Sequence, residues 1–273
     1  MMLPHDVLHI LLRATVRVFR RCGTQAQAVA FNMFLAFFPM VLLVFAVLAS
    51  THERRAVVQE FFARLRAILP PGSQQVVVDF LVRRATHPWR WATLGVVGTL
   101  LAGMQVMKLF MNGFLAIHGD AGRPGFWSRQ ARSLLLLLAT ILPWLAAMIL
   151  TVFSKQLCAW LIRHLGLPVF FRDLWAVGYV ATALAIAMLV LTIIYRVGRP
   201  AARTWREVLP GAVVATLLWW GLNSAFGAYV RKMQYSLVFG SLATAIGLLV
   251  WMQLNALVVF LGEAFNAEWE SRR

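Results

Sequence analysis

Long apolar runs separated by short polar links dominate the sequence. Six of these runs reach the length of about 20 mostly apolar residues that a helix needs to cross a bilayer. The pattern predicts an all-α polytopic membrane protein with six transmembrane helices, built as a single membrane domain over residues 1–273. The predicted spans cover residues 29–50, 91–117, 134–153, 175–196, 208–230 and 240–262.

An amphipathic segment, residues 1–28, includes the approach to the first span. Its basic and apolar side chains recur at helical spacing, so they occupy different faces of a helix. We expect an N-terminal helix that lies in the membrane interface and turns its arginines toward phosphate groups. The basic face holds Arg13, Arg17, Arg20 and Arg21, and the other face holds Leu8, Leu11, Leu12, Thr15 and Phe19.

Residues 51–90, between the first two spans, are too polar to cross a membrane but amphipathic enough to fold. We expect an extramembrane helical hairpin, broken by the turn residues Pro70, Pro71 and Gly72. The hairpin includes seven arginines. Two interpretations remain open. It is either a pair of surface helices whose long side chains reach out to water, or a platform that gathers an anionic substrate.

The span 91–117 has two faces that do not suit lipid. One face is polar, because three polar side chains follow an i, i+3, i+7 spacing and line up on one side of a helix. The other face consists of small residues at spacings of four, which lets a second helix approach closely. The polar face holds Gln105, Lys108 and Asn112, and the small-residue face holds Gly95, Thr99 and Gly103.

Lys108 is the charged side chain within the span 91–117. A lysine at the centre of a membrane helix costs about 2.5–3.5 kcal/mol on insertion scales. Two interpretations stay open here as well. The amine either extends along its four-carbon stem to the membrane interface, or it lies in a cavity and faces an anionic headgroup or a carboxylate.

Other polar side chains are predicted at membrane depth. Each amide among them either joins helices through hydrogen bonds worth about 0.6–2 kcal/mol or lines a route through the protein. Our hypothesis combines them into a substrate path of Gln105, Lys108, Asn112, Asn32, Asn223, Asn255 and Glu263. We expect the basic links to bind anionic headgroups through Arg129, Arg132, Arg196 and Arg199.

Composition supports the membrane class. The chain is 61% hydrophobic and 13% charged, whereas soluble domains average about 25% charged residues. Its formal net charge is +16, which in a soluble protein would suggest nucleic acid. In a chain of membrane helices we instead expect the arginines to flank the spans and meet lipid headgroups. The predicted partners are therefore membrane lipids with anionic headgroups, and not nucleic acid.

The orientation depends on the basic residues of the links, because six spans place both termini on one side. Segments on the side of the termini hold 13 Lys and Arg, and segments on the other side hold 12. Without the loop 51–90, the second figure falls to five. That comparison favours both termini in the cytoplasm.

The sequence gives no sign of an active site. It contains no phosphate-binding P-loop and no HExxH motif, and apart from His5 and His9 its histidines are scattered. No pair of carboxylates lies deep within a predicted span, so proton coupling of the usual carboxylate kind is not indicated. We predict no enzymatic activity, no cofactor and no metal site.

Three stretches of the chain resemble the YihY/BrkB family of bacterial inner-membrane proteins. They are AVAFNMFLAFFPMVLLVFA at 28–46, MNGFLAIHGDAGRPGFWSRQARSLLLL at 111–137 and most of 205–267. One departure is the order Gly262-Glu263-Ala264, where the family usually has Gly-Ala-Glu. The third stretch is the most specific, with matches at Gly211, Ala212, Phe226, Tyr229, Gly240, Trp251, Gly262 and Asn266.

The resemblance implies a six-span inner-membrane protein of a family discussed as transporters, some suggested to move lipids or lipid-A precursors. An old label for the family is ribonuclease BN. We hypothesise a transporter of a lipid or other anionic amphiphile. The alternative is a non-catalytic scaffold that docks an envelope protein through residues 51–90, and a homo-oligomer is left open. A ribonuclease is the third hypothesis, and it would need a metal site that the sequence does not indicate.

Overall fold

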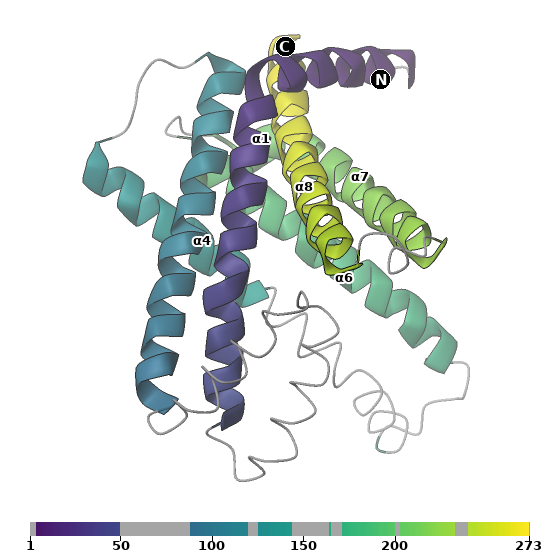
Figure 1. Ribbon diagram of the computed structural model, residues 1–273. Coiled ribbons are helices and arrows are strands. Elements are labelled where there is room, and N and C mark those ends of the chain that lie inside the picture. The colour runs from purple at the N-terminus through teal and green to yellow at the C-terminus, as the bar shows by residue number, and fades with distance from the viewer. Residues whose placement is uncertain are drawn as a thin grey trace. The chain divides into compact units, whose positions relative to one another are not determined.

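The computed structural model describes residues 4–49, 88–119, 125–143, 164, 171–199, 203–232 and 240–272. Within these residues every regular element is a helix, as the all-α prediction requires. A further helical segment covers 126–143. The helices labelled in Figure 1 are α1 (Pro4–Ala49), α4 (Pro88–His118), α6 (Phe171–Val197), α7 (Trp205–Lys232) and α8 (Gly240–Glu270). Most of the predicted hairpin, residues 51–87, lies outside the described part of the chain.

Four of the described helices are long and apolar enough to cross a membrane. These stretches are His9–Leu43, Ala92–His118, Trp205–Tyr229 and Ala245–Glu270. A shorter apolar stretch, Ala181–Val197, lies in α6. The class of helical membrane protein is therefore confirmed, while the number of six spans stays a prediction.

Two helices differ from the predicted boundaries. The N-terminal amphipathic segment and the first span are one continuous helix, α1, rather than two elements. The last helix continues to Glu270, although the predicted span ends at residue 262. The charged tail can remain helical because Glu263, which is fully buried, and Glu268, which is 7% exposed, pair with arginines from other elements.

The described contacts fall into two units, which we describe separately. Unit 1 comprises Met1–Gly23, Phe110–Leu222 and Leu257–Arg273, and unit 2 comprises Thr24–Leu109 and Asn223–Ala256.

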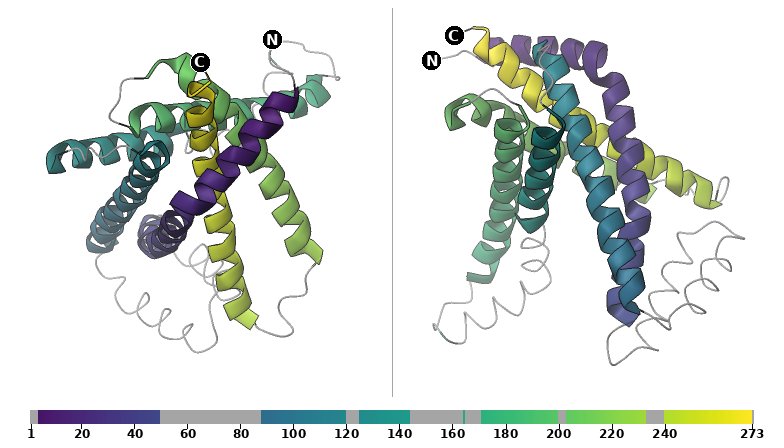
Figure 2. Two further views of the ribbon diagram at one scale, coloured as in Figure 1. Left: turned by 90° about the horizontal axis from the view of Figure 1, so that it is seen from above. Right: turned by 90° about the vertical axis from the view of Figure 1, so that its left-hand side faces the viewer.

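In unit 2, α1 and α4 lie side by side (Figures 1 and 2). A Cβ atom added to Gly95 would lie 2.8 Å from the backbone nitrogen of Leu43, and one added to Gly98 would lie 2.9 Å from the Pro39 ring. Only a glycine lets two backbones come this close. The prediction that Gly95 belongs to a helix-packing face is confirmed.

Unit 1 has an aromatic core. Phe114 of α4 packs edge-on against Tyr195 of α6 at 5.8 Å and against Phe260 of α8 at 6.0 Å between ring centroids. Phe110 lies 5.4 Å from Phe260. The Tyr195 hydroxyl donates a 2.9 Å hydrogen bond to the Val259 carbonyl, which satisfies its polar end. These contacts fix the ends of three helices around the ionic cluster described next.

Candidate functional site

The most deeply buried charges of the described residues form an ionic cluster in unit 1. Arg203 lies just before α7, and its side chain is 3% exposed. Its Nη1 donates to Glu263 Oε1 at 2.6 Å, and its Nε donates to Glu270 Oε1 at 2.9 Å. Nη2 also donates to Glu270. One guanidinium therefore bridges two carboxylates of α8.

The local sequence explains why Arg203 is held at this point. Residues 204–207 read Thr-Trp-Arg-Glu, a helix-capping pattern. The backbone amide of Thr204 donates to Glu207 Oε2 at 2.9 Å, which fixes the start of α7. Arg203, the residue before Thr204, is thereby held at the N-terminus of α7 with its side chain directed to α8.

A close approach of α7 and α8 completes the cluster. The Gly211 amide donates to Asn266 Oδ1 at 2.7 Å, and Asn266 Nδ2 donates to the Val208 carbonyl at 3.2 Å and to Glu263 Oε2 at 3.3 Å. A Cβ atom at Gly211 would overlap the Gly262 carbonyl oxygen. Gly211 and Gly262 let α7 and α8 approach closely, and the side-chain amide of Asn266 reaches the α7 backbone only at this separation.

Two more basic side chains border the cluster. His118, at the end of α4, places Nε2 3.6 Å from Glu263 Oε1 and 4.0 Å from Glu270 Oε2. Its Nδ1 lies 3.0 Å from the Phe114 carbonyl oxygen, a suitable distance for that nitrogen to donate. Arg199 Nη1 lies 4.0 Å from Glu270 Oε2. Two arginines, Arg199 and Arg203, therefore face two glutamates, Glu263 and Glu270.

The electrostatics make Arg203 a permanent cation. Burial alone would lower the pKa of its guanidinium, but the adjacent carboxylates of Glu263 and Glu270 outweigh burial and raise that pKa above its ordinary value. Removing one partner of a buried ion pair costs about 3–5 kcal/mol, because the other charge is left without compensation. The loss of either partner of the Arg203–Glu263 pair should therefore strongly destabilise the cluster.

The predicted path residues of α4 have a different environment. Gln105 is exposed and Lys108 is half-buried. Within the described part of the chain, neither side chain makes a hydrogen bond or an ion pair. Asn112 is half-buried, and its Oδ1 accepts a 3.1 Å hydrogen bond from Arg129 Nη2. The structure thus joins one predicted path residue to one predicted headgroup-binding residue.

The other three amides of the predicted path bond within unit 2. Asn223 of α7 accepts a 2.9 Å hydrogen bond from Trp251 Nε1 of α8, which joins the two helices. Asn32 donates to the Ala28 carbonyl at 2.8 Å, and Asn255 donates to the Trp251 carbonyl at 2.7 Å, each within its own helix.

The predicted headgroup-binding arginines do not form one group. Arg129 contacts Asn112, as above. Arg132 is half-buried. The Arg196 guanidinium lies over the Trp205 ring, 4.2 Å from its centroid, as a cation–π pair. Arg199 lies beside Glu270 in the ionic cluster.

The sequence pattern predicts Glu263 on the substrate path, but it does not mark Arg203, Asn266 and Glu270 as a site. A signal was available, because Glu263, Asn266 and Glu270 follow the same i, i+3, i+7 spacing as the α4 stripe. The predicted last span ends at residue 262, so Asn266 and Glu270 fall outside it and the shared spacing is easily missed. Among the described residues, no group of three or more His, Cys, Asp and Glu side chains is arranged to hold a metal ion.

Comparison with known proteins settles the family. The sequence profile of the family described as virulence factor BrkB matches residues 18–273. The chain belongs to the BrkB family. The resemblance seen in the sequence is therefore confirmed over nearly its whole length, and the ionic cluster lies inside the matched region. No solved structure matches this BrkB-family chain.

Relatives of this BrkB-family protein bear general names. A ribonuclease-like protein of Bacillus subtilis, YfkH, is 21% identical over 92% of this chain and 90% of its own length. UPF0761 membrane proteins of Laribacter hongkongensis and Nitrosospira multiformis are each 26% identical, over 90% and 99% of this chain. The matches span 57% and 62% of those two relatives. Their names and the four apolar helices agree on a membrane protein.

Proposed function

We propose that the protein transports an anionic amphiphile, most simply a lipid, across the bacterial inner membrane. The route would follow the polar stripe of α4 between helices. Both termini would lie in the cytoplasm, and the partners would be membrane lipids with anionic headgroups. The chain would act without enzymatic chemistry, so the word ribonuclease in the name of the Bacillus relative is not carried over.

The hydrogen bond from Arg129 to Asn112 gives this proposal its main support. This bond extends the polar stripe of α4 to the guanidinium of Arg129, which lies in the helical segment 126–143 that follows α4 in the sequence. On α4 itself, Lys108 precedes Asn112 by four residues, a rise of about 6 Å along the helix axis. A stripe that includes an amine and ends at a guanidinium suits a phosphate or carboxylate headgroup.

Lys108 has the properties expected of a substrate contact. Ionisable residues within membrane helices are costly and commonly mark a substrate pathway. The Lys108 side chain is half-buried, and it makes no ion pair within the residues that the structure describes. An amine held in this way can still pair with a passing anion. The scaffold alternative depends on residues 51–90, of which 51–87 lie outside the described chain.

The test is the transfer of a fluorescent anionic lipid between leaflets of proteoliposomes that contain the purified protein. We expect Lys108→Leu to abolish most of the protein-dependent transfer and Lys108→Arg, which keeps the charge, to retain it. Each variant is first checked for insertion and folding. If Lys108→Leu inserts, folds and transfers lipid at the full rate, Lys108 is not a substrate contact and this route is wrong.

A further inference from the structure

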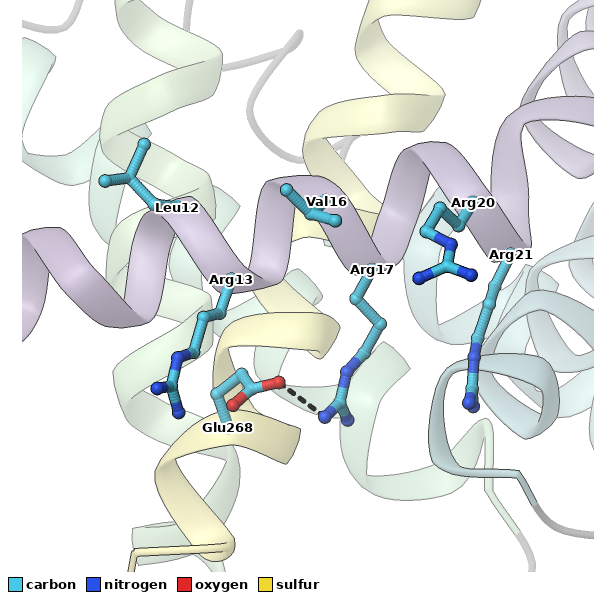
Figure 3. Close-up of a pocket in the computed structure, with 7 residues that line it drawn as sticks. All are labelled: Leu12, Arg13, Val16, Arg17, Arg20, Arg21 and Glu268. Carbon is cyan, nitrogen blue, oxygen red and sulfur yellow. Dashed lines mark ion pairs between the residues drawn. The ribbon is translucent and has the colours of Figure 1, made fainter.

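A basic groove runs along the N-terminal stretch of α1 within unit 1 (Figure 3). Its volume is about 690 Å³. In Figure 3, three of its arginines extend toward the side on which Glu268 of α8 lies, whereas Leu12 points away from it. The lining consists of Leu12, Arg13, Val16, Arg17, Arg20, Arg21 and Glu268.

Two of the four arginines are held in place by the protein. Arg17 pairs with Glu268, the carboxylate that lines the groove. Arg21 Nη1 donates to the carbonyl oxygens of Ala116 and Ile117 at 3.1 and 3.3 Å, where α4 ends with its last carbonyls unpaired by helix bonds. These bonds hold the guanidinium groups of Arg17 and Arg21 in fixed positions along the groove.

The charges of the other two arginines are not balanced by a carboxylate of the described residues. Arg13 and Arg20 are exposed, and neither pairs with a carboxylate in the part of the chain that the structure describes. The groove therefore presents four guanidinium groups against one carboxylate. From Arg13 to Arg21 the row advances eight residue steps along α1, or about 12 Å. Such a row of guanidinium donors binds phosphate oxygens well.

The apolar side chains beside the groove distinguish a lipid from a free anion. The face that packs into unit 1 is formed by Ile10, Ala14 and Val18, each fully buried. Leu12 and Val16, which line the groove, are 57% exposed, and Phe19 is 65% exposed. Leucine, valine and phenylalanine in this position offer acyl chains a surface, whereas a small soluble anion would leave them uncovered.

We propose that this groove is a binding site for the phosphate-bearing headgroup of an anionic membrane lipid. Arg13 and Arg20 contact the phosphate directly, while Arg17 and Arg21 supply the fixed positive field. The acyl chains run along Leu12, Val16 and Phe19. The site binds its lipid whether or not the protein moves lipid, so it does not depend on the transport proposed above.

The experiment measures binding to the full-length protein in a neutral detergent by native mass spectrometry. The probes are short-chain phosphatidylglycerol, which is anionic, and phosphatidylcholine, which is not. Arg13→Gln/Arg20→Gln is compared with Arg90→Gln/Arg206→Gln, which removes the same charge from two exposed positions outside the groove. Because each arginine near an anionic lipid surface contributes about 1 kcal/mol, we expect the first variant to weaken phosphatidylglycerol binding about 30-fold and the control to bind as the wild type does.

A second variant should strengthen phosphatidylglycerol binding instead of weakening it. Glu268→Gln removes the carboxylate from the groove and leaves Arg17 unpaired, so phosphatidylglycerol should bind about 5-fold more tightly. Equal binding of both lipids, or equal loss in the groove variant and its control, would overturn the proposal. Displacement of the lipid by an equal concentration of inorganic phosphate would also overturn it, because the site would then belong to a free anion.

Discussion

The polar stripes of α4 and α8 share one spacing but differ in environment. On α8, Glu263 and Asn266 are fully buried, and Glu263 and Glu270 both bond to Arg203. On α4, Gln105 is exposed and Lys108 half-buried, and within the described residues only the third member, Asn112, has a partner outside its helix. The spacing of polar residues therefore predicts a shared face, but not what that face does.

The difference lies in whether a complementary charge is built into the chain. Arg203 is held directly before α7 by the capping of that helix, and it pairs with both carboxylates of the α8 stripe from inside the protein. Buried networks of ion pairs and hydrogen bonds rigidify a fold. The α4 stripe, in contrast, keeps an amine available. We infer that the α8 stripe is structural and that the α4 stripe is the one open to a ligand.

The largest expected effect follows from removing the bridging cation. Arg203→Met leaves Glu263 buried without its paired arginine, which should lower the free energy of unfolding by about 3–5 kcal/mol. Thermal unfolding in detergent, followed by circular dichroism, measures the change. Arg206→Gln is the control, since that side chain is exposed, and its change should stay within about 0.5 kcal/mol. An Arg203→Met protein as stable as the control would show that the cluster does not hold the fold.

The α4 stripe should respond in the opposite direction. Lys108→Leu removes an amine from a membrane helix without stranding a carboxylate partner, so the protein should gain up to about 2.5–3.5 kcal/mol in insertion free energy. A translocon-insertion assay of the α4 segment, with Lys108→Arg as the matched charged variant, reports this gain. A loss of stability in the full-length protein would instead reveal a hidden partner for Lys108.

A smaller effect is expected where α7 and α8 meet. A Cβ atom at Gly211 would overlap the Gly262 carbonyl and the Asn266 side chain, whereas one at Gly221 meets nothing within 4 Å. Gly211→Ala should therefore cost about 1–3 kcal/mol of stability, and Gly221→Ala, on the same helix, should cost nothing. Equal melting temperatures for the two variants would contradict the close approach of the helices.

The sequence predicted the helical class because long apolar runs need little context to be recognised. It also predicted the packing role of Gly95, since small residues at spacings of four indicate helix contact. It did not predict the ionic cluster, because Arg203, His118 and Glu263 come from distant parts of the chain. The predicted last span ends at residue 262, and the helix α8 continues to Glu270, where Arg203 and Arg17 pair with the carboxylates of residues 263–270.

The position of Glu263 directly after Gly262 determines what its carboxylate can reach. In this chain the carboxylate follows Gly262 directly, and from that position Glu263 reaches both Arg203 and Asn266. A shift of one residue would turn the carboxylate about 100° around the helix. The interpretation of Glu263 as part of the substrate path therefore competes with a structural role that its contacts support directly.

The most direct test compares lipid transfer by two variants that disable one stripe each. Lys108→Leu alters the α4 stripe, and the double change Arg203→Met/Glu263→Leu replaces the buried ion pair by apolar side chains, an exchange that is often neutral for stability. The rate of anionic lipid transfer in proteoliposomes is measured per inserted, folded protein. We predict loss of transfer in Lys108→Leu and near-normal transfer in the double variant. Normal transfer in Lys108→Leu together with loss in the folded double variant would contradict this prediction.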